Sequence, residues 1–226
     1  MLKFSANIDF LFTELPFYKR ISAAKKFGFT GIESLFPYTY DIKYIKQLLD
    51  DNQISQVLFN FPPGDLEKGE RGIAIFPDRE KEFLDGLHKT IESAQFLNCS
   101  KLHMMSGIIK NENNINLYFN TYLKNLETAC KVLEDTNINI LIEPINNFDM
   151  PNYFIDNINR ALDIINTLQN SRVGLQCDIY HLQKTNGNII HNLFKNFKII
   201  KHIQIAGVPD RYEPNIGELN FDYIFK

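Results

Sequence analysis

Short apolar runs alternate with longer amphipathic stretches along the whole chain. The runs are rich in Ile, Val, Leu and Phe and are followed by polar residues, which is typical of strands, whereas the stretches between them have helical spacing. The pattern predicts strands at 2–7, 31–36, 55–60, 101–106, 138–143, 173–178 and 200–205. It predicts helices near 14–28, 41–52, 78–98, 115–136, 154–169 and 187–197, with Pro16, Asp41, Pro77 and Asp78 near helix starts.

Strands that alternate with helices in this way are expected to be parallel, because each helix returns the chain for another pass in the same direction. A doubly wound sheet and a TIM barrel are the two common closures. The barrel is favoured because SANIDF stands where a glycine-rich phosphate loop would follow the first strand, and because polar residues end nearly every strand. We expect residues 1–226 to form a single α/β domain, an incomplete (β/α)8 TIM barrel with about seven parallel strands and the last βα unit missing.

Composition and charge limit the kinds of molecule that the chain is expected to bind. Of the 226 residues, 44% are hydrophobic, and the formal net charge is -3. The chain therefore lacks the broad basic field that draws proteins to nucleic acid or anionic membranes, and it has no apolar run that could span a bilayer. Three distant cysteines and a polar N-terminal stretch are typical of the reducing cytoplasm. We expect a cytoplasmic protein that acts on a small molecule, has no nucleic-acid or membrane partner, and forms a homo-oligomer if it assembles at all.

Three polar residues end consecutive predicted strands: Glu143 in INILIE, Asp178 in VGLQCD and Gln204 in IKHIQ. The carboxyl ends of TIM barrel strands form one rim, where the active site lies, so these side chains are expected to converge. Their oxygens suit a divalent cation such as Mg²⁺ or Mn²⁺ and leave positions open for a chelating substrate. One strand-end carboxylate is more often a cap or a surface residue, and the conjunction of three favours a metal site.

Longer segments are distinctive, namely SANIDFLFTELPF, FNFPPGDLEKGERGIA, LIEPIN, QCDIYH, HIQIAGVPDRYEP and GELNF. Together they resemble hydroxypyruvate isomerases and the related 2-oxo-tetronate isomerases, within the xylose isomerase-like TIM barrels, from residue 1 to about residue 222. The resemblance implies that Glu143 is an acid/base residue and metal ligand, and that Asp178 and Gln204 are further ligands. The family's second catalytic glutamate lies on a final strand, in a C-E-Y-x-P-like segment that this sequence does not contain.

The resemblance further implies an intramolecular oxidoreductase of the aldose–ketose type, which interconverts hydroxypyruvate and 2-hydroxy-3-oxopropanoate (tartronate semialdehyde) in glyoxylate metabolism. A base removes a proton from the carbon that bears the hydroxyl group, an enediolate forms, and the proton returns at the neighbouring carbon. A divalent cation, Mg²⁺ or Mn²⁺, is the implied cofactor and stabilises the negative charge. With one catalytic glutamate absent, Glu143 alone is expected to shuttle the proton, at a reduced rate.

An oxo or hydroxy acid substrate also needs a cationic anchor for its carboxylate, and planar bidentate binding favours arginine. The candidate substrate-binding residues are Arg71 in GERG and Arg211 in PDRYEP. Each is alternatively a solvated loop arginine or an ion-pair partner, of Glu70 or of Glu213 respectively.

Histidines near the strand ends are further candidates. His181, three residues after Asp178, is expected to hydrogen-bond the substrate or a metal ligand. His103, within LHMM, is more typical of a satisfied core residue. Glu33 and Asn60 also lie near strand ends, where we interpret them as polar rim residues.

Other functions stay open. A 2-oxo-tetronate isomerase or a sugar epimerase of the same superfamily would differ in pocket size rather than in these ligands. DNA-repair endonucleases of the superfamily have metal sites that are rich in histidine, and this chain has only five histidines. Its net charge also does not favour binding to DNA phosphates. The alternative of another class is a truncated, inactive barrel that acts at most as a binding protein.

Overall fold

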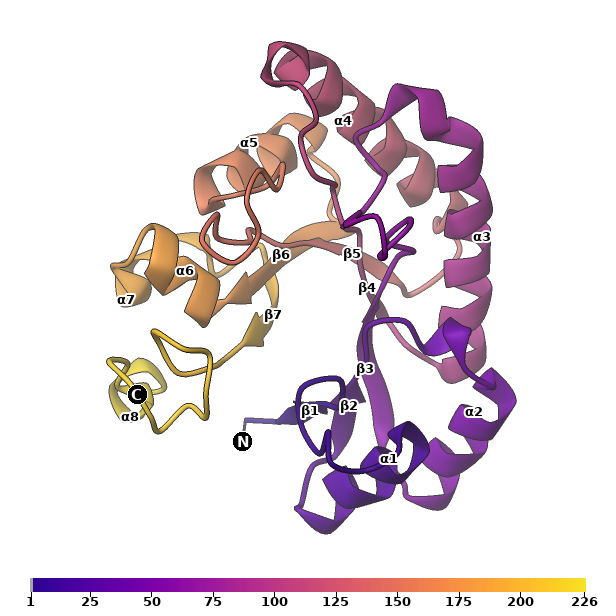
Figure 1. The fold of residues 1–226 in the computed structure, drawn as a ribbon, viewed down its shortest axis with the longest axis vertical. Coiled ribbons are helices and arrows are strands. Elements are labelled where there is room, and N and C mark those ends of the chain that lie inside the picture. The colour runs from indigo at the N-terminus through magenta and orange to yellow at the C-terminus, as the bar shows by residue number, and fades with distance from the viewer. Residues whose placement is uncertain (1) are drawn as a thin grey trace.

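Seven short strands lie side by side in one parallel sheet, in the order in which they occur in the chain. The computed structural model describes residues 2–226, and in it the sheet curls with the helices on its outer side (Figure 1). The strands are β1 (Ser5–Asn7), β2 (Gly31–Glu33), β3 (Ser55–Asn60), β4 (Lys101–His103), β5 (Asn139–Ile142), β6 (Val173–Asp178) and β7 (Ile200–Gln204). A sequential parallel order is that of a barrel, so the predicted seven-stranded, incomplete TIM barrel is confirmed and a doubly wound sheet is excluded.

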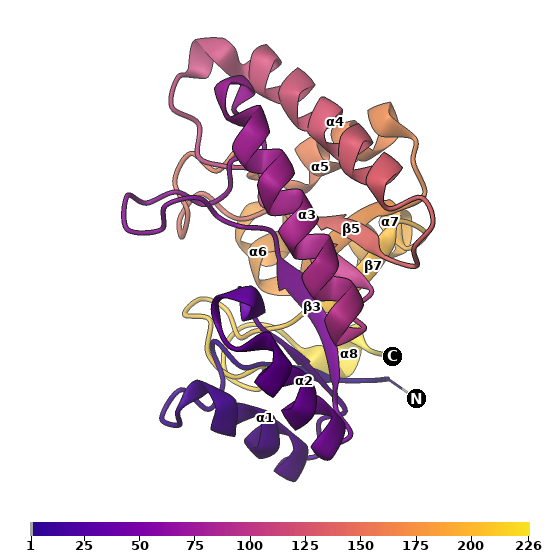
Figure 2. The same cartoon turned by 90° about the vertical axis from the view of Figure 1, so that its right-hand side faces the viewer.

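Helices follow the strands and form the outer layer. They are α1 (Phe17–Lys26), α2 (Ile42–Asp51), α3 (Glu80–Leu97), α4 (Ile115–Val132), α5 (Ile158–Leu168), α6 (Ile179–Thr185), α7 (Ile189–Asn196) and α8 (Phe221–Ile224). Short 3₁₀ turns precede three of them, namely η1 (Pro37–Thr39), η2 (Pro77–Arg79) and η3 (Glu112–Asn114). Figure 2 shows the two longest helices, α3 and α4, on the outside of the strands. None of the helices within residues 2–226 combines the length and the apolar character that crossing a membrane requires.

Local polar signals set several helix boundaries. Asp41 begins α2, as predicted, because its carboxylate accepts hydrogen bonds from two backbone N–H groups of the first turn, at 3.0 and 3.2 Å. Asn157 caps α5 through the backbone N–H of Arg160 (3.1 Å), so this helix begins four residues after the predicted start at 154. Helix α6 was not predicted. It is short, and its cap is Asp178, which the sequence pattern marks only as a strand end.

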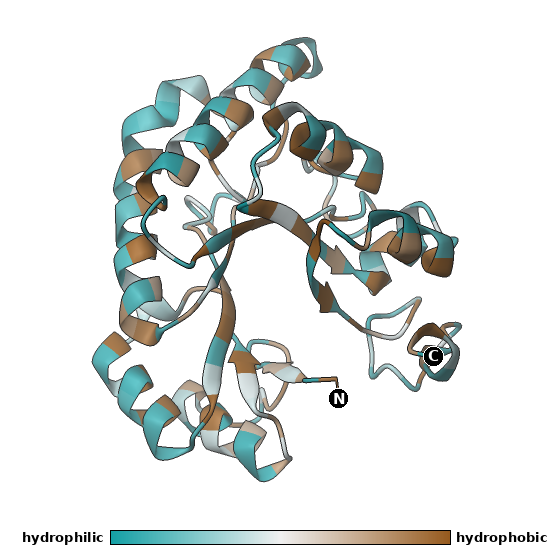
Figure 3. Ribbon diagram, turned by 180° about the vertical axis from the view of Figure 1, so that it is seen from behind, coloured by the Kyte–Doolittle hydropathy of each residue, from teal (hydrophilic) through white to brown (hydrophobic). Residues whose placement is uncertain are grey.

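The two sides of the sheet differ in polarity, because successive strand residues point to opposite sides. On the outer side, Ile140, Ile142 and Leu175 are fully buried in the core shared with the helices. Hydrophobic residues recur along the strands and on the helices in Figure 3. Polar side chains meet on the inner side: Lys201 Nζ donates to Asn139 Oδ1 at 2.7 Å, for example. The core that holds the fold together therefore lies outside the sheet, and the inner side is left for polar chemistry.

Strands β1 and β7 form the two edges of the described sheet and do not pair with each other. Side chains nevertheless connect the two ends. His202 Nε2 and Gln204 Nε2 of β7 each lie 2.7 Å from a carboxylate oxygen of Glu33, at the end of β2. These contacts join parts of the chain about 170 residues apart across the open side.

Candidate active site

Two carboxyl groups and an imidazole meet at the carboxyl ends of β5 and β6. Glu143 directly follows β5, Asp178 is the last residue of β6, and His181 lies in the first turn of α6. Their exposed fractions are 6%, 4% and 2%, respectively, and one ligand atom of each lies within 4.8 Å of the others. The structure thus places three of the predicted site residues in one buried cluster at the rim where TIM barrel sites are found.

Burial dominates the electrostatics of Glu143. Burial, and after it the neighbouring Asp178, raise the pKa of this carboxyl to about 8, although Arg211 and Gln176 act in the opposite direction. His103 Nδ1 lies 3.4 Å from Glu143 Oε2, and burial lowers the His103 pKa to about 3, so this imidazole is neutral. Glu143 therefore titrates near neutral pH, in the range where a group can both take up and release a proton.

Asp178 is held from two directions. Its Oδ1 accepts the backbone N–H of Tyr180 at 2.9 Å and so begins α6. Its Oδ2 accepts from Arg211 Nη2 at 3.1 Å and lies 3.7 Å from His181 Nε2. Because Oδ1 caps α6, formation of this helix fixes the orientation of the carboxylate. Oδ2 is left facing the cluster.

The tautomer of His181 follows from its neighbour Asn146. The Asn146 Oδ1 accepts two backbone N–H groups of its own turn at 3.0 Å, so its Nδ2 is the atom that faces His181 Nδ1, at 2.7 Å. Nδ1 is therefore an acceptor. Burial lowers the pKa of His181 to about 4, so the neutral ring carries its proton on Nε2. His181 consequently presents an N–H donor to the cluster, which suits the predicted contact with substrate better than metal ligation.

The two candidate arginines lie in different surroundings. The guanidinium of Arg211 packs over the rings of Phe10 and Tyr180, 5.2 and 5.0 Å from their centroids, while it donates to Asp178. It retains 36% side-chain exposure, so it lies at the cluster and can still be reached from solvent. Arg71 instead donates to the backbone carbonyls of Leu66 and Glu70 in its own loop, and the structure records no contact between it and the cluster.

Gln204 is connected to the cluster through a hydrogen bond with the side-chain amide of Gln176 rather than by direct contact. Its Oε1 accepts from Gln176 Nε2 at 2.9 Å, and its Nε2 donates to Glu33. Sequence reasoning missed Glu33 and Gln176 as parts of the site. The period of two along β6 could have found Gln176, because it lies on the same side as Asp178. Only the curvature of the sheet brings Glu33 to β7, and no short sequence pattern indicates that contact.

The donor set fits a divalent cation. Carboxylate oxygens of Glu143 and Asp178 lie together, and Gln204 Oε1 has one neutral donor, which leaves it a second lone pair. Oxygen donors of this kind suit Mg²⁺ or Mn²⁺. Among the described residues, Arg211 is the one cation that lowers the pKa of Glu143, and a divalent ion would relieve the repulsion between Glu143 and Asp178.

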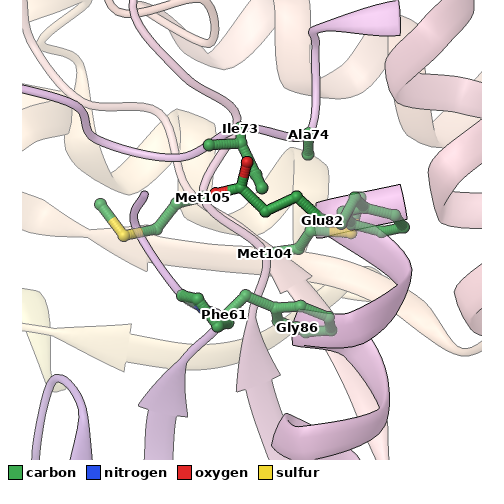
Figure 4. A pocket seen from close by; sticks show the side chains of 9 residues that line it. Phe61, Ile73, Ala74, Glu82, Gly86, Met104 and Met105 are labelled. Atoms are coloured by element: carbon green, nitrogen blue, oxygen red, sulfur yellow. The ribbon is translucent and has the colours of Figure 1, made fainter. Parts of the chain in front are cut away.

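A separate pocket is too small for a substrate. Figure 4 shows it between the ends of β3 and β4 and helix α3, with Phe61, Met104 and Met105 among its lining residues. Its volume is about 10 Å³, room for about one water molecule. This pocket is therefore not a candidate for the substrate site.

Comparison with known proteins identifies the family to which the chain belongs. The model of the xylose isomerase-like TIM barrel family matches residues 21–226. Hydroxypyruvate isomerase of Escherichia coli (strain K12) is 39% identical over 226 residues, which are 100% of this chain and 88% of that protein. The 2-oxo-tetronate isomerase of Cupriavidus necator is 37% identical, over 100% of this chain and 87% of that protein. The crystal structure of an AP endonuclease, family 2, from Brucella melitensis has a TM-score of 0.97 and 39% identity, and the match covers 100% of this chain and 87% of that one.

Two of these three relatives are named as isomerases, which supports an isomerase-type enzyme. The predicted resemblance is therefore confirmed, and the chain belongs to the hydroxypyruvate isomerase family of the xylose isomerase-like TIM barrels.

Proposed function

We propose that this protein is an isomerase that interconverts hydroxypyruvate and tartronate semialdehyde by proton transfer through an enediolate. One observation carries the proposal: the buried Glu143 carboxyl has a pKa of about 8 and lies beside Asp178, so it is poised to exchange a proton near neutral pH. The names of the relatives supply the substrate class, an oxo acid of three or four carbons.

The reaction transfers one proton between two adjacent carbons, and a single basic side chain that reaches both carbons can carry it. The ionised Glu143 takes a proton from C3 of hydroxypyruvate, which leaves the enediolate, and returns it to C2, while a second proton passes from the oxygen on C3 to the oxygen on C2. The Nε2–H of His181 faces the cluster and can donate to a substrate oxygen. Burial of both groups keeps water away from the proton that Glu143 carries.

Glu143, Asp178 and Gln204 would hold the divalent cation, with Mg²⁺ or Mn²⁺ preferred by their oxygen donors. When bound, the cation would supply stabilisation of negative oxygen and a lower pKa for the Glu143 carboxyl. Arg211 would bind the substrate carboxylate, since it is the exposed cation at the cluster. Arg71 remains a second predicted anchor, in a loop that pairs with the segment after β4 through the bridge between Gly72 and Ser106.

The proposal is tested by following isomerisation by proton NMR in D₂O, with hydroxypyruvate and Mg²⁺ or Mn²⁺. Glu143→Gln keeps the shape of the side chain and removes the base, and Glu92→Gln, on the exposed side of α3, is the matched control. We expect turnover and deuterium incorporation with the natural chain and with Glu92→Gln, and at least a hundredfold loss with Glu143→Gln. Equal rates for all three chains, or no turnover by the natural chain, would refute the proposal.

A four-carbon substrate is the second candidate, because 2-oxo-tetronate isomerases are similarly close relatives. The same assay with 2-oxo-tetronate separates the two. A higher kcat/KM with this acid would assign the longer substrate while leaving the role of Glu143 unchanged. Turnover of neither acid would favour the inactive barrel.

A further inference from the structure

A third buried carboxylate lies inside the barrel, apart from Glu143 and Asp178. Glu33 is 5% exposed, and its two oxygens have different partners. Oε1 is 2.5 Å from Ser5 Oγ and 2.7 Å from His202 Nε2. Oε2 accepts from Gln204 Nε2 at 2.7 Å. One oxygen thus contacts β1 and the middle of β7, and the other is dedicated to the Gln204 amide.

A carboxylate accepts hydrogen bonds and cannot donate them, so Glu33 dictates which end of the Gln204 amide faces it. With Nε2 turned to Glu33, Oε1 must point the other way, where it accepts from Gln176 Nε2. The Gln176 side chain also lowers the pKa of Glu143, so it lies on the Glu143 side. The amide of Gln204 therefore has a fixed polarity, with its donor end at Glu33 and its acceptor end on the Glu143 side.

We propose that Glu33 is a positioning residue, which holds Gln204 so that its Oε1, and not its N–H₂ group, is presented to the cation. An amide turned by half a rotation would offer two N–H donors and no lone pair to the ion. Glu33 acts through Gln204 and does not contact the substrate. The inference rests on the proposed function in one respect, that Gln204 is a ligand.

A purely structural role is the competing explanation, because Glu33 also joins β2 to β7 across the open side of the sheet. His202→Ala is the matched control. It removes the 2.7 Å contact to Oε1 and leaves the contact between Oε2 and Gln204 intact. A structural role predicts that both variants lose stability and cation affinity together, whereas a positioning role predicts that only the Glu33 variant loses affinity.

The first measurement is Mn²⁺ affinity by isothermal titration calorimetry. Glu33→Gln can turn its own amide and so no longer fixes Gln204, and we expect at least tenfold weaker Mn²⁺ binding, within the range known for residues that orient metal ligands. The Mn²⁺ affinity of His202→Ala should stay within about threefold of that of the natural chain, because His202 contacts Glu33 Oε1 and the contact that orients Gln204 is made by Oε2. Equal affinity in Glu33→Gln and the natural chain, or equal losses in both variants, would overturn the inference.

An exchange of the two residues gives a sharper test. Gln204→Glu alone sets two carboxylates in contact, so they must share a proton. In the double variant Glu33→Gln with Gln204→Glu, the new amide donates to the new carboxylate, and the oxygen is presented again. We expect the double variant to bind Mn²⁺ at least tenfold more tightly than either single variant. Binding by Gln204→Glu as tight as that of the double variant would show that added charge alone is responsible, and would contradict the inference.

A measurement without metal separates this inference from the proposed function. The side-chain N–H₂ group of Gln204 gives an NMR signal whose hydrogen exchange is slow while Glu33 Oε2 holds it. We expect slow exchange in the natural chain and at least tenfold faster exchange in Glu33→Gln. If the natural chain binds no Mn²⁺ and the exchange result still holds, the metal part of the proposed function fails while Glu33 keeps its effect on the amide. Fast exchange in the natural chain would refute the inference itself.

Discussion

The Glu143→Gln variant should be more stable than the natural chain at neutral pH, although it removes a group from the active site. Burial and the neighbouring Asp178 raise the pKa of Glu143 from its usual 4.5 to about 8. A carboxyl whose pKa is raised in the folded state favours the unfolded chain as the pH rises above 4.5, because only the unfolded chain ionises freely. The free energy of unfolding should therefore fall with increasing pH until about pH 8, and then level off.

The size of this effect follows from the two pKa values. Between pH 5 and pH 7, the free energy of unfolding of the natural chain should fall by about 2–3 kcal/mol through this group alone. Glutamine has a similar shape and no charge, so Glu143→Gln should not show this fall. His103 and His181, whose pKa values burial lowers, oppose it below pH 6.5, but they act in both chains and cancel in the comparison.

Urea unfolding at pH 5 and pH 7, with EDTA present, provides the assay. We expect the stability advantage of Glu143→Gln to grow between these pH values by an amount of the order of 2 kcal/mol. Glu92→Gln, which changes an exposed glutamate, should show no such growth. An advantage that does not change with pH would refute the assignment of a raised pKa to Glu143. Adding Mn²⁺ should then stabilise the natural chain more than the variant, since a cation favours the ionised carboxylate.

The remaining predictions concern the anchor, the histidine, the core and the cation. Arg211→Met should raise the KM for the oxo acid at least tenfold with a smaller change in kcat, measured by steady-state kinetics, because the substrate carboxylate loses its charged donor. Asn146→Ala should lower kcat about tenfold without loss of fold by circular dichroism, because the proton on His181 is no longer fixed to Nε2. Tyr122→Phe should cost about 1–3 kcal/mol in urea unfolding, because it leaves the buried carbonyl of Met104 without its 2.7 Å hydrogen bond. Mn²⁺ at 100 times its Kd should add about 2.7 kcal/mol of stability at pH 7.5, which EDTA should remove; an unchanged Tm would contradict a cation site.

The sequence pattern was sufficient for the order and type of the strands, because each strand has its own apolar run and each helix its own amphipathic stretch. All seven predicted strands exist, and their carboxyl ends carry the predicted residues. The first, second and fourth strands are shorter than predicted, at three residues each. Their apolar residues continue past the ladder into buried loops, as at Met104 and Met105, so hydrophobicity alone could not mark where the pairing ends.

The network around the cluster was harder to predict, because it depends on which strands face each other across the curled sheet. Glu33 and His202 are about 170 residues apart and lie on strands that do not pair, so their contact follows from curvature rather than from any local pattern. Asn146 and His181 are closer in the sequence, 35 residues apart, but their contact is likewise not indicated by a local pattern. Strand-end position identifies the residues that point to the rim, and the tertiary structure then decides which of them are donors and which acceptors.

The placement of the core explains why so many buried polar groups are tolerated at this site. The inner side of the sheet carries Glu33, His103, Glu143 and Gln176, each less than 7% exposed, and isolated groups of this kind would be costly to bury. The apolar contacts that stabilise the fold are made on the other side, between strands and helices, so the inner side is free to be selected for hydrogen bonding and charge. It follows that substitutions on the inner side should change proton affinity and ligand binding, and should change stability mainly through the ionisation of buried groups, as in Glu143→Gln. Those on the outer side, such as Ile142→Ala, should cost about 2–5 kcal/mol of stability and leave the arrangement of the cluster intact in the molecules that remain folded.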